Sequence, residues 1–132
     1  MILIDSNVLM YAAGADHPNK ARAVTLLKRV AGGDAEAAID AEVLQEILHR
    51  YTALGRRADA QRVYELARTL FPEVLAITGE VMDKARRIVG KYDGVSARDA
   101  VHAAVVVTYA LDGIWTFDGD FDRILECRRV RV

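Results

Sequence analysis

The chain has 132 residues, enough for one domain with a buried core. Its composition, 52% hydrophobic and 28% charged, is typical of globular proteins and excludes a disordered or fibrous chain. No apolar run reaches the roughly 20 residues that a membrane helix needs, and no basic stretch precedes Met1–Ile4 as in a signal peptide. The single cysteine, Cys127, excludes an internal disulfide, so we expect a cytoplasmic protein. The net charge of −1 does not by itself indicate a nucleic-acid partner.

Short apolar segments alternate with longer helical patterns along the chain. Four of these segments predict buried strands, at 2–4, 37–39, 74–77 and 114–117, and the alternating tail at 129–132 predicts a fifth strand at an edge. Periodic apolar residues predict helices at about 16–31, 41–54, 57–71, 78–93 and 96–111. The first of these is expected to begin at Asp16, with Pro18 in its first turn.

Strands separated by helices predict an α/β fold, with a mostly parallel sheet and helices on both faces. In such folds the functional site lies beyond the carboxyl ends of the strands. Two acids stand at such positions, Asp5 after the first strand and Asp118 after the fourth. A functional carboxylate is therefore expected at this edge of the sheet.

Each acidic residue also has an ordinary structural interpretation. Asp5 is equally well explained as the N-cap of a helix at 8–13, and Ser96-x-x-Asp99 fits a capping box. Asp118 lies in a sequence rich in turn formers, and Glu46 stands four residues before Arg50, as in an exposed helical ion pair. Gathered at one sheet edge, however, these carboxylates would repel one another unless a cation neutralised them, and oxygen ligands suit Mg²⁺ or Mn²⁺.

The histidines and the cysteine give no comparable pattern. His17, His49 and His102 are scattered, without the paired spacing of a metal site. His102 follows Asp99 by three residues and could reach the cleft, but a packing or surface role explains it better. We assign no catalytic role to Cys127.

Four segments resemble the PIN domain in that family's order: Ile4-Asp5-Ser6-Asn7-Val8-Leu9, Val43-Leu44-Gln45-Glu46-Ile47-Leu48, the helix start Ser96–Ala104, and Thr116-Phe117-Asp118-Gly119-Asp120-Phe121-Asp122. The resemblance runs from the first residues to about Asp122, nearly the whole chain. The size and the absence of a fused domain are similar to those of the VapC-type toxins of VapBC toxin–antitoxin systems.

The resemblance implies a single PIN domain over residues 1–132, with a three-layer α/β/α fold and about five strands. It also implies a ribonuclease with one or two Mg²⁺ or Mn²⁺ ions, a homodimer, and inhibition by a cognate VapB-type antitoxin. Carried over by position, the family's acids fall on Asp5, Glu46, Asp99 and Asp118, as catalytic and metal-binding residues. The supporting positions fall on Ser6, Asn7, Thr116 and Asp122. Asp40 stands where a small polar residue is expected, and we interpret it as a helix cap.

The proposed chemistry assigns these acids to an ion that activates water and polarises the phosphate. We expect Asp5 and Asp99 to be the shared ligands, with Asp118 and Glu46 completing the cluster or orienting the water. On a helical wheel Glu46 lies at the border of the apolar stripe, whereas Glu42 points to solvent, so we expect Glu46 to be the helical acid. Single-stranded or looped RNA is the expected substrate, because its bases can be splayed out and recognised.

Alternative functions differ in what they require of the sequence. A haloacid-dehalogenase phosphohydrolase would have Asp-x-Asp where this chain has Asp5-Ser6-Asn7, and a receiver domain would have an acidic pair and a late lysine. A metal-dependent phosphohydrolase of another α/β family is a further alternative. A PIN-fold interaction module without nuclease activity would be indicated by the loss of an acid, and all four are present.

Overall fold

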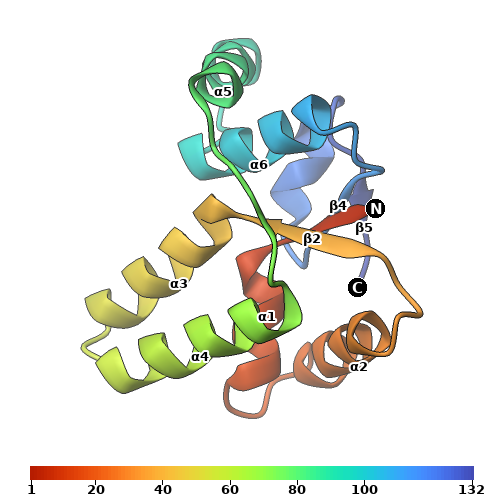
Figure 1. Ribbon diagram of the computed structural model, residues 1–132. Coiled ribbons are helices and arrows are strands. Elements are labelled where there is room, and N and C mark those ends of the chain that lie inside the picture. The colour runs from red at the N-terminus through yellow and green to blue at the C-terminus, as the bar shows by residue number, and fades with distance from the viewer.

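A five-stranded parallel sheet forms the centre of the molecule in the computed structural model, which describes residues 1–132 (Figure 1). Its order is β3-β2-β1-β4-β5, and every neighbouring pair is parallel. The strands are β1 (Ile2–Ile4), β2 (Ala37–Asp40), β3 (Val74–Leu75), β4 (Ile114–Trp115) and β5 (Arg129–Val130). The predicted parallel α/β sheet of about five strands is therefore confirmed, with the tail as an edge strand.

Helices cover both faces of this sheet and give three layers. One face is covered by α1 (Ser6–Ala13), α2 (Lys20–Ala31), α3 (Ala41–Ala53) and α4 (Arg57–Leu70). The other is covered by α5 (Gly79–Lys91) and α6 (Ala97–Thr108), which pack against each other in Figure 1. A short 3₁₀ helix, η1 (Gly119–Arg123), follows β4. None of these helices combines the length and apolarity that crossing a membrane requires.

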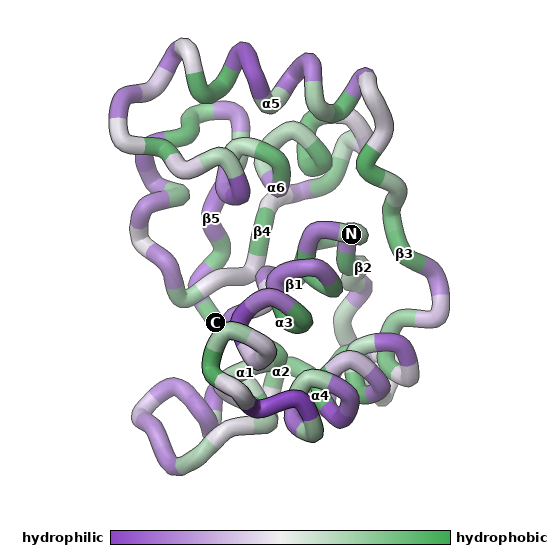
Figure 2. The backbone as a smooth tube through the Cα atoms, turned by 90° about the vertical axis from the view of Figure 1, so that its left-hand side faces the viewer, coloured by the Kyte–Doolittle hydropathy of each residue, from purple (hydrophilic) through white to green (hydrophobic).

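Two hydrophobic clusters, one on each face, hold the layers together. Successive strand residues point to opposite faces, so Leu3 packs with α5 and α6 while Ile4 packs with the other four helices. In the same way Ile114 and Trp115 belong to different clusters. In Figure 2 the strands lie between the two helical layers, and α4 and α5 alternate between hydrophilic and hydrophobic residues. This is the pattern of helices with one buried face.

Several element boundaries differ from the sequence prediction. Helix α2 begins at Lys20, not at Asp16, with Asn19 at the N-cap position. The reason is a turn closed by His17: its Nδ1 accepts a hydrogen bond from the Asn19 amide (3.1 Å), and its carbonyl accepts one from the Lys20 amide (3.0 Å). Strand β3 is two residues long instead of four, because its partner β2 ends at Asp40, which is paired with Leu75.

The parallel register brings three chain segments to one edge of the sheet. Ile4 pairs with Trp115, so Asp5 lies beside Thr116, and the Asp5 amide donates to the Trp115 carbonyl (3.0 Å). Asp40 ends β2 at the same edge. Polar residues from β1, β2 and β4 therefore converge where the site was expected.

Candidate metal centre

A polar cleft of about 280 Å³ opens at the carboxyl edge of the sheet. No hydrophobic residue lines it. The structure places all four predicted acids there together with the supporting Ser6 and Asn7; the full lining is Asp5, Ser6, Asn7, Glu46, Gly94, Ser96, Arg98, Asp99, Asp118 and Asp120. Residues far apart in the sequence thus form one acidic site.

The carboxylate of Asp5 is held by two donors on one of its oxygens. Oδ2 accepts hydrogen bonds from Thr116 Oγ1 (2.6 Å) and Asn7 Nδ2 (3.1 Å), and Oδ1 lies 3.3 Å from Ser6 Oγ, whose hydrogen is directed to Glu46. Asp5 occupies the N-cap position of α1, as the structural interpretation had it, but its side chain makes no cap bond and is directed to other partners. Burial, as the largest effect, raises its pKa above the ordinary value, although Thr116 and His102 act in the opposite direction.

The buried hydroxyl of Thr116 connects two of the acids. While it donates to Asp5, its oxygen accepts from the Asp118 amide (2.9 Å) and from Asn7 Nδ2 (3.0 Å). Asp118 in turn caps η1, accepting from the Asp120 amide (2.8 Å). Thr116 therefore links the carboxylate of Asp5 to the turn that carries Asp118.

Asp99 enters the cleft from the first turn of α6. Ser96 caps this helix by accepting from the Asp99 amide (3.1 Å), and both residues line the cleft. Its carboxylate comes within 4.8 Å of those of Asp118 and Asp120. Burial, followed by repulsion from Asp118 and Asp5, raises the pKa of Asp99 to about 6.

The carboxylate of Glu46 reaches the cleft from α3, and both of its oxygens have donors. Oε2 accepts from the Ser6 hydroxyl, and Oε1 lies 3.0 Å from His102 Nε2. Burial alone would raise its pKa, but the bonds and charge of His102 outweigh that effect and the pKa is lowered. Glu42 does not line the cleft, yet it is half-buried and not turned fully to solvent; burial, then Glu46, raises its pKa.

Two residues missing from the sequence-based site, His102 and Asp40, lie directly behind Glu46. His102 is fully buried, which rules out the surface role considered for it, and its Nδ1 lies 2.7 Å from Asp40 Oδ2. Asp40 caps α3 as expected, its Oδ1 accepting from the Val43 amide (2.9 Å), and it also binds the imidazole. Burial lowers the pKa of His102, but the opposite effect of Asp40 and Glu46 is larger. The pKa of His102 therefore lies well above its ordinary value.

Asp122, a supporting position in the resemblance, does not line the cleft. Its side chain is 61% exposed and pairs with Arg129 through two bonds of 2.9 and 3.0 Å. The 3₁₀ helix η1 carries Asp120 into the lining of the cleft, whereas Asp122, two residues later, is paired with Arg129. Arg98, which the sequence did not single out, is the one basic residue in the lining and has no carboxylate within 4.0 Å.

The donor set of the cleft fits a hard divalent cation. Potential ligand atoms form two groups within 4.8 Å, one of Asp5, Glu46 and His102 and one of Asp99, Asp118 and Asp120. Both ring nitrogens of His102 face carboxylates and donate to them, so neither has a lone pair for an ion, and the ligands of the first group are its two carboxylates. A site built from oxygen ligands favours Mg²⁺ or Mn²⁺ over zinc.

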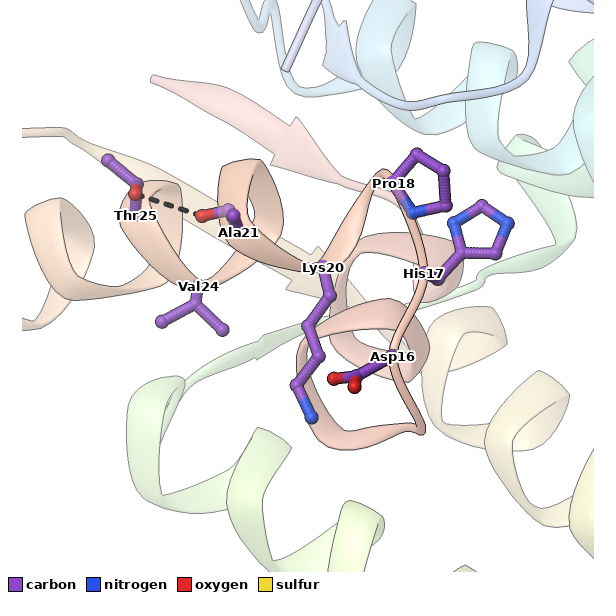
Figure 3. Close-up of a pocket in the computed structure, with 7 residues that line it drawn as sticks. All are labelled: Asp16, His17, Pro18, Lys20, Ala21, Val24 and Thr25. Atoms are coloured by element: carbon purple, nitrogen blue, oxygen red, sulfur yellow. Dashed lines mark hydrogen bonds between the residues drawn. The ribbon is translucent and has the colours of Figure 1, made fainter.

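A larger hollow of about 740 Å³ lies elsewhere, at the turn before α2 (Figure 3). Its charged groups are limited to Asp16, Lys20 and, when protonated, His17, and the one hydrogen bond drawn joins Thr25 to the Ala21 carbonyl (2.9 Å). Neither group of three potential metal ligands lies in it. The acidic cleft is therefore the better candidate for a reaction site.

Comparison with known proteins agrees with the fold. The family model described as the PIN domain matches residues 2–126. This chain belongs to the PIN domain family. It is 42% identical over 122 residues to a VapC ribonuclease of Mycobacterium bovis, an alignment covering 92% of this chain and 93% of that protein.

Solved structures share the fold of this PIN domain at low sequence identity. VapBC2 of Rickettsia felis, bound to a DNA fragment from its promoter, matches with a TM-score of 0.76 and 14% identity, over 100% of this chain and 99% of the matched chain. VapC20 of Mycobacterium tuberculosis, described as a sarcin-ricin loop cleaving toxin, has a TM-score of 0.76, 18% identity, and coverage of 92% and 93%. These likenesses confirm the three-layer α/β/α fold.

Proposed function

We propose that this chain is a metal-dependent endoribonuclease and the toxin of a VapBC toxin–antitoxin pair. The observation that carries the proposal is the convergence of five carboxylates and one arginine in a cleft without hydrophobic lining. A 42% identical relative is named a VapC ribonuclease, and structural neighbours include VapBC and other toxin–antitoxin complexes. An acid cluster that can hold a divalent cation suits phosphodiester hydrolysis, because the cation would neutralise the negative charge that develops on the phosphate oxygens.

In this proposal Asp5 and Asp99 hold the ion jointly, with Asp118 and Glu46 as further ligands directly or through water. A bound Mg²⁺ or Mn²⁺ supplies a water of lowered pKa and polarises the phosphoryl oxygens. Mg²⁺ keeps several of its waters, so the site does not need all four carboxylates in contact with it.

The chain's own residues prepare the site for a phosphodiester. Thr116 and Asn7 fix the carboxylate of Asp5 before any ligand arrives, which removes the cost of ordering it during the reaction. Arg98, free of carboxylate partners, binds the phosphate backbone at the entrance of the cleft. Asp118 or Glu46 accepts the proton of the attacking water. The substrate is single-stranded or looped RNA, whose backbone can enter an open cleft.

The partners in this proposal are a cognate VapB-type antitoxin and a second copy of the chain, in a cytoplasmic setting that keeps Cys127 reduced. Most apolar residues of α3 and α4 lie in the core, but Leu48 and Leu54 are 38% and 49% exposed. Such side chains are available to an interface.

The experiment mixes purified protein with a single-stranded RNA and with Mg²⁺, Mn²⁺ or EDTA. Endonucleolytic products should form with either ion, disappear in EDTA and be absent for Asp99→Asn. RNA binding without cleavage under every metal condition would favour the interaction module, and hydrolysis of small phosphate esters alone would favour another phosphohydrolase.

A further inference from the structure

Behind the cleft, His102 lies between a carboxylate that lines the site and one that does not. Its ring has no exposed surface, and its two nitrogens face Glu46 Oε1 (3.0 Å) and Asp40 Oδ2 (2.7 Å). Carboxylates accept hydrogen bonds, so the ring donates at both ends. The three side chains come from α3, α6 and the end of β2, and therefore link the two helical layers beside the site.

Asp40 is itself fixed in place by the backbone. Its Oδ1 accepts from the Val43 amide at the start of α3, and its other oxygen is left for His102. A serine or threonine would cap this helix equally well but has a single side-chain oxygen. Capping α3 therefore does not explain why an aspartate stands at this position. The only other side-chain hydrogen bond that Asp40 makes is the one to His102.

Glu46 needs such support because of its length and its neighbours. A glutamate side chain has three rotatable bonds, and the charge of the nearby Asp5 repels it. Ser6 binds one of its oxygens and His102 the other, which leaves the carboxylate a single orientation at the cleft wall. Orienting a metal-binding carboxylate through a hydrogen-bonded neighbour raises metal affinity, because the ligand is ordered before the ion binds.

We propose that His102, held by Asp40, is a positioning residue that orients Glu46 and thereby sets the metal affinity of the cleft. The inference rests on the proposed metal-dependent function. It concerns a residue that neither binds the ion nor touches the substrate, since both of its nitrogens are engaged by carboxylates.

The test is a double-mutant cycle read from Mn²⁺ binding, by calorimetry or electron paramagnetic resonance, in the absence of RNA. His102→Phe, which fills the space without a donor, should raise the dissociation constant for Mn²⁺ by roughly 10- to 100-fold. Glu46→Gln should raise it as well, and the double variant should bind no more weakly than Glu46→Gln alone, because His102 acts through Glu46. His102→Gln, which keeps an N–H donor, should recover part of the affinity.

The matched control is Val105→Ala, a fully buried position one turn further along α6 that loses core packing without touching Glu46. It should lower thermal stability but leave Mn²⁺ binding unchanged. The proposal is overturned if His102→Phe binds Mn²⁺ as wild type does, or if its effect adds fully to that of Glu46→Gln.

If His102→Phe does not fold, Asp40→Asn replaces it in the same cycle. This variant keeps an oxygen to cap α3 but loses the carboxylate that orients the imidazole. It should weaken Mn²⁺ binding several-fold, and only when Glu46 is present; an effect of equal size in the Glu46→Gln background would overturn the proposal. Cleavage of RNA by the wild type is scored separately, so failure of the ribonuclease function and failure of the positioning role give different results.

Discussion

Asp99 and Asp118 bring their carboxylates within 4.8 Å of each other, one from the start of α6 and the other from the turn after β4. Neither has a basic side chain within 4.0 Å. Burial, then Asp118 and Asp5, raises the pKa of Asp99 to about 6. Metal-free protein at neutral pH therefore carries an unfavourable charge in this cleft, which a divalent cation would neutralise.

In EDTA, Asp99→Asn should make the protein more stable at pH 7.5. The unfolded carboxyl has an ordinary pKa of 3.8, so between about pH 4 and 6 the folded state binds more protons and stability falls as pH rises. Above this window the whole penalty is present, and the neutral amide removes it. We expect a gain of about 1 kcal/mol, reduced from the full shift because the group is partly solvated.

Urea unfolding of both proteins near pH 4 and at pH 7.5 measures this difference. The two proteins should be nearly equal in acid and should separate at neutral pH. A constant difference between them at both values would show that charge repulsion at Asp99 does not contribute.

Asp5→Asn should abolish RNA cleavage while the fold is retained. The substitution keeps the size of a buried side chain and removes one ligand charge from the centre of the cluster. Loss of a metal-binding carboxylate should reduce the rate by more than about 100-fold at limiting Mg²⁺. Cleavage assays with circular dichroism as the folding control test this, and wild-type rates in limiting Mg²⁺ would contradict the metal-site assignment.

Thr116→Val should damage the site and the fold together. Valine has nearly the same shape but can neither donate to Asp5 nor accept from the Asp118 amide. Leaving buried polar groups without a partner costs about 1–3 kcal/mol, so unfolding should shift by that amount. Thr116→Ser, which keeps the hydroxyl, is the matched control and should retain most of the Mg²⁺-dependent activity; equal losses in both variants would point to the methyl group instead.

The sequence was sufficient for features that depend on topology. Asp5 and Asp118 follow adjacent parallel strands, and the carboxyl ends of such strands meet whatever the side-chain packing. The resemblance to the PIN domain added Glu46 and Asp99. Without it, Glu46 was equally consistent with a surface ion pair, and Asp99 with a capping box.

Features that depend on tertiary packing could not be predicted. One oxygen of Asp40 caps α3, as the sequence pattern predicts. The neighbouring sequence contains no signal that His102 of α6 binds the other oxygen. Asp120 lines the cleft where the sequence analysis named Asp122. This difference follows from the 3₁₀ helix, which has no strong sequence periodicity. A possible signal for Asp40 was its place at the end of a strand on the same edge as Asp5.

The chain should form a homodimer at micromolar concentration. Leu48 on α3 and Leu54 in the turn after it are the large apolar side chains of the 43–70 region that are exposed. Multi-angle light scattering measures the mass, and Leu48→Glu with Leu54→Glu should shift the protein towards the 14.6 kDa monomer. A wild-type monomer, or a dimer indifferent to both substitutions, would place the interface elsewhere or exclude it.

Glu46, and not Glu42, should be the helical acid that activity requires. Glu46 lies in the cleft with both carboxylate oxygens bound, whereas Glu42, one turn earlier, is half-buried outside the lining. Glu46→Gln should therefore lose most activity and raise the Mg²⁺ concentration needed for half-maximal cleavage by at least about 10-fold. Glu42→Gln removes a more distant charge and should change that concentration by less than about 3-fold. The measurement is the cleavage rate of both variants as a function of Mg²⁺ concentration. The two variants are matched, because each loses one negative charge from the same helix. A larger effect at Glu42 would mean that α3 contributes its acid from one turn nearer its N-terminus.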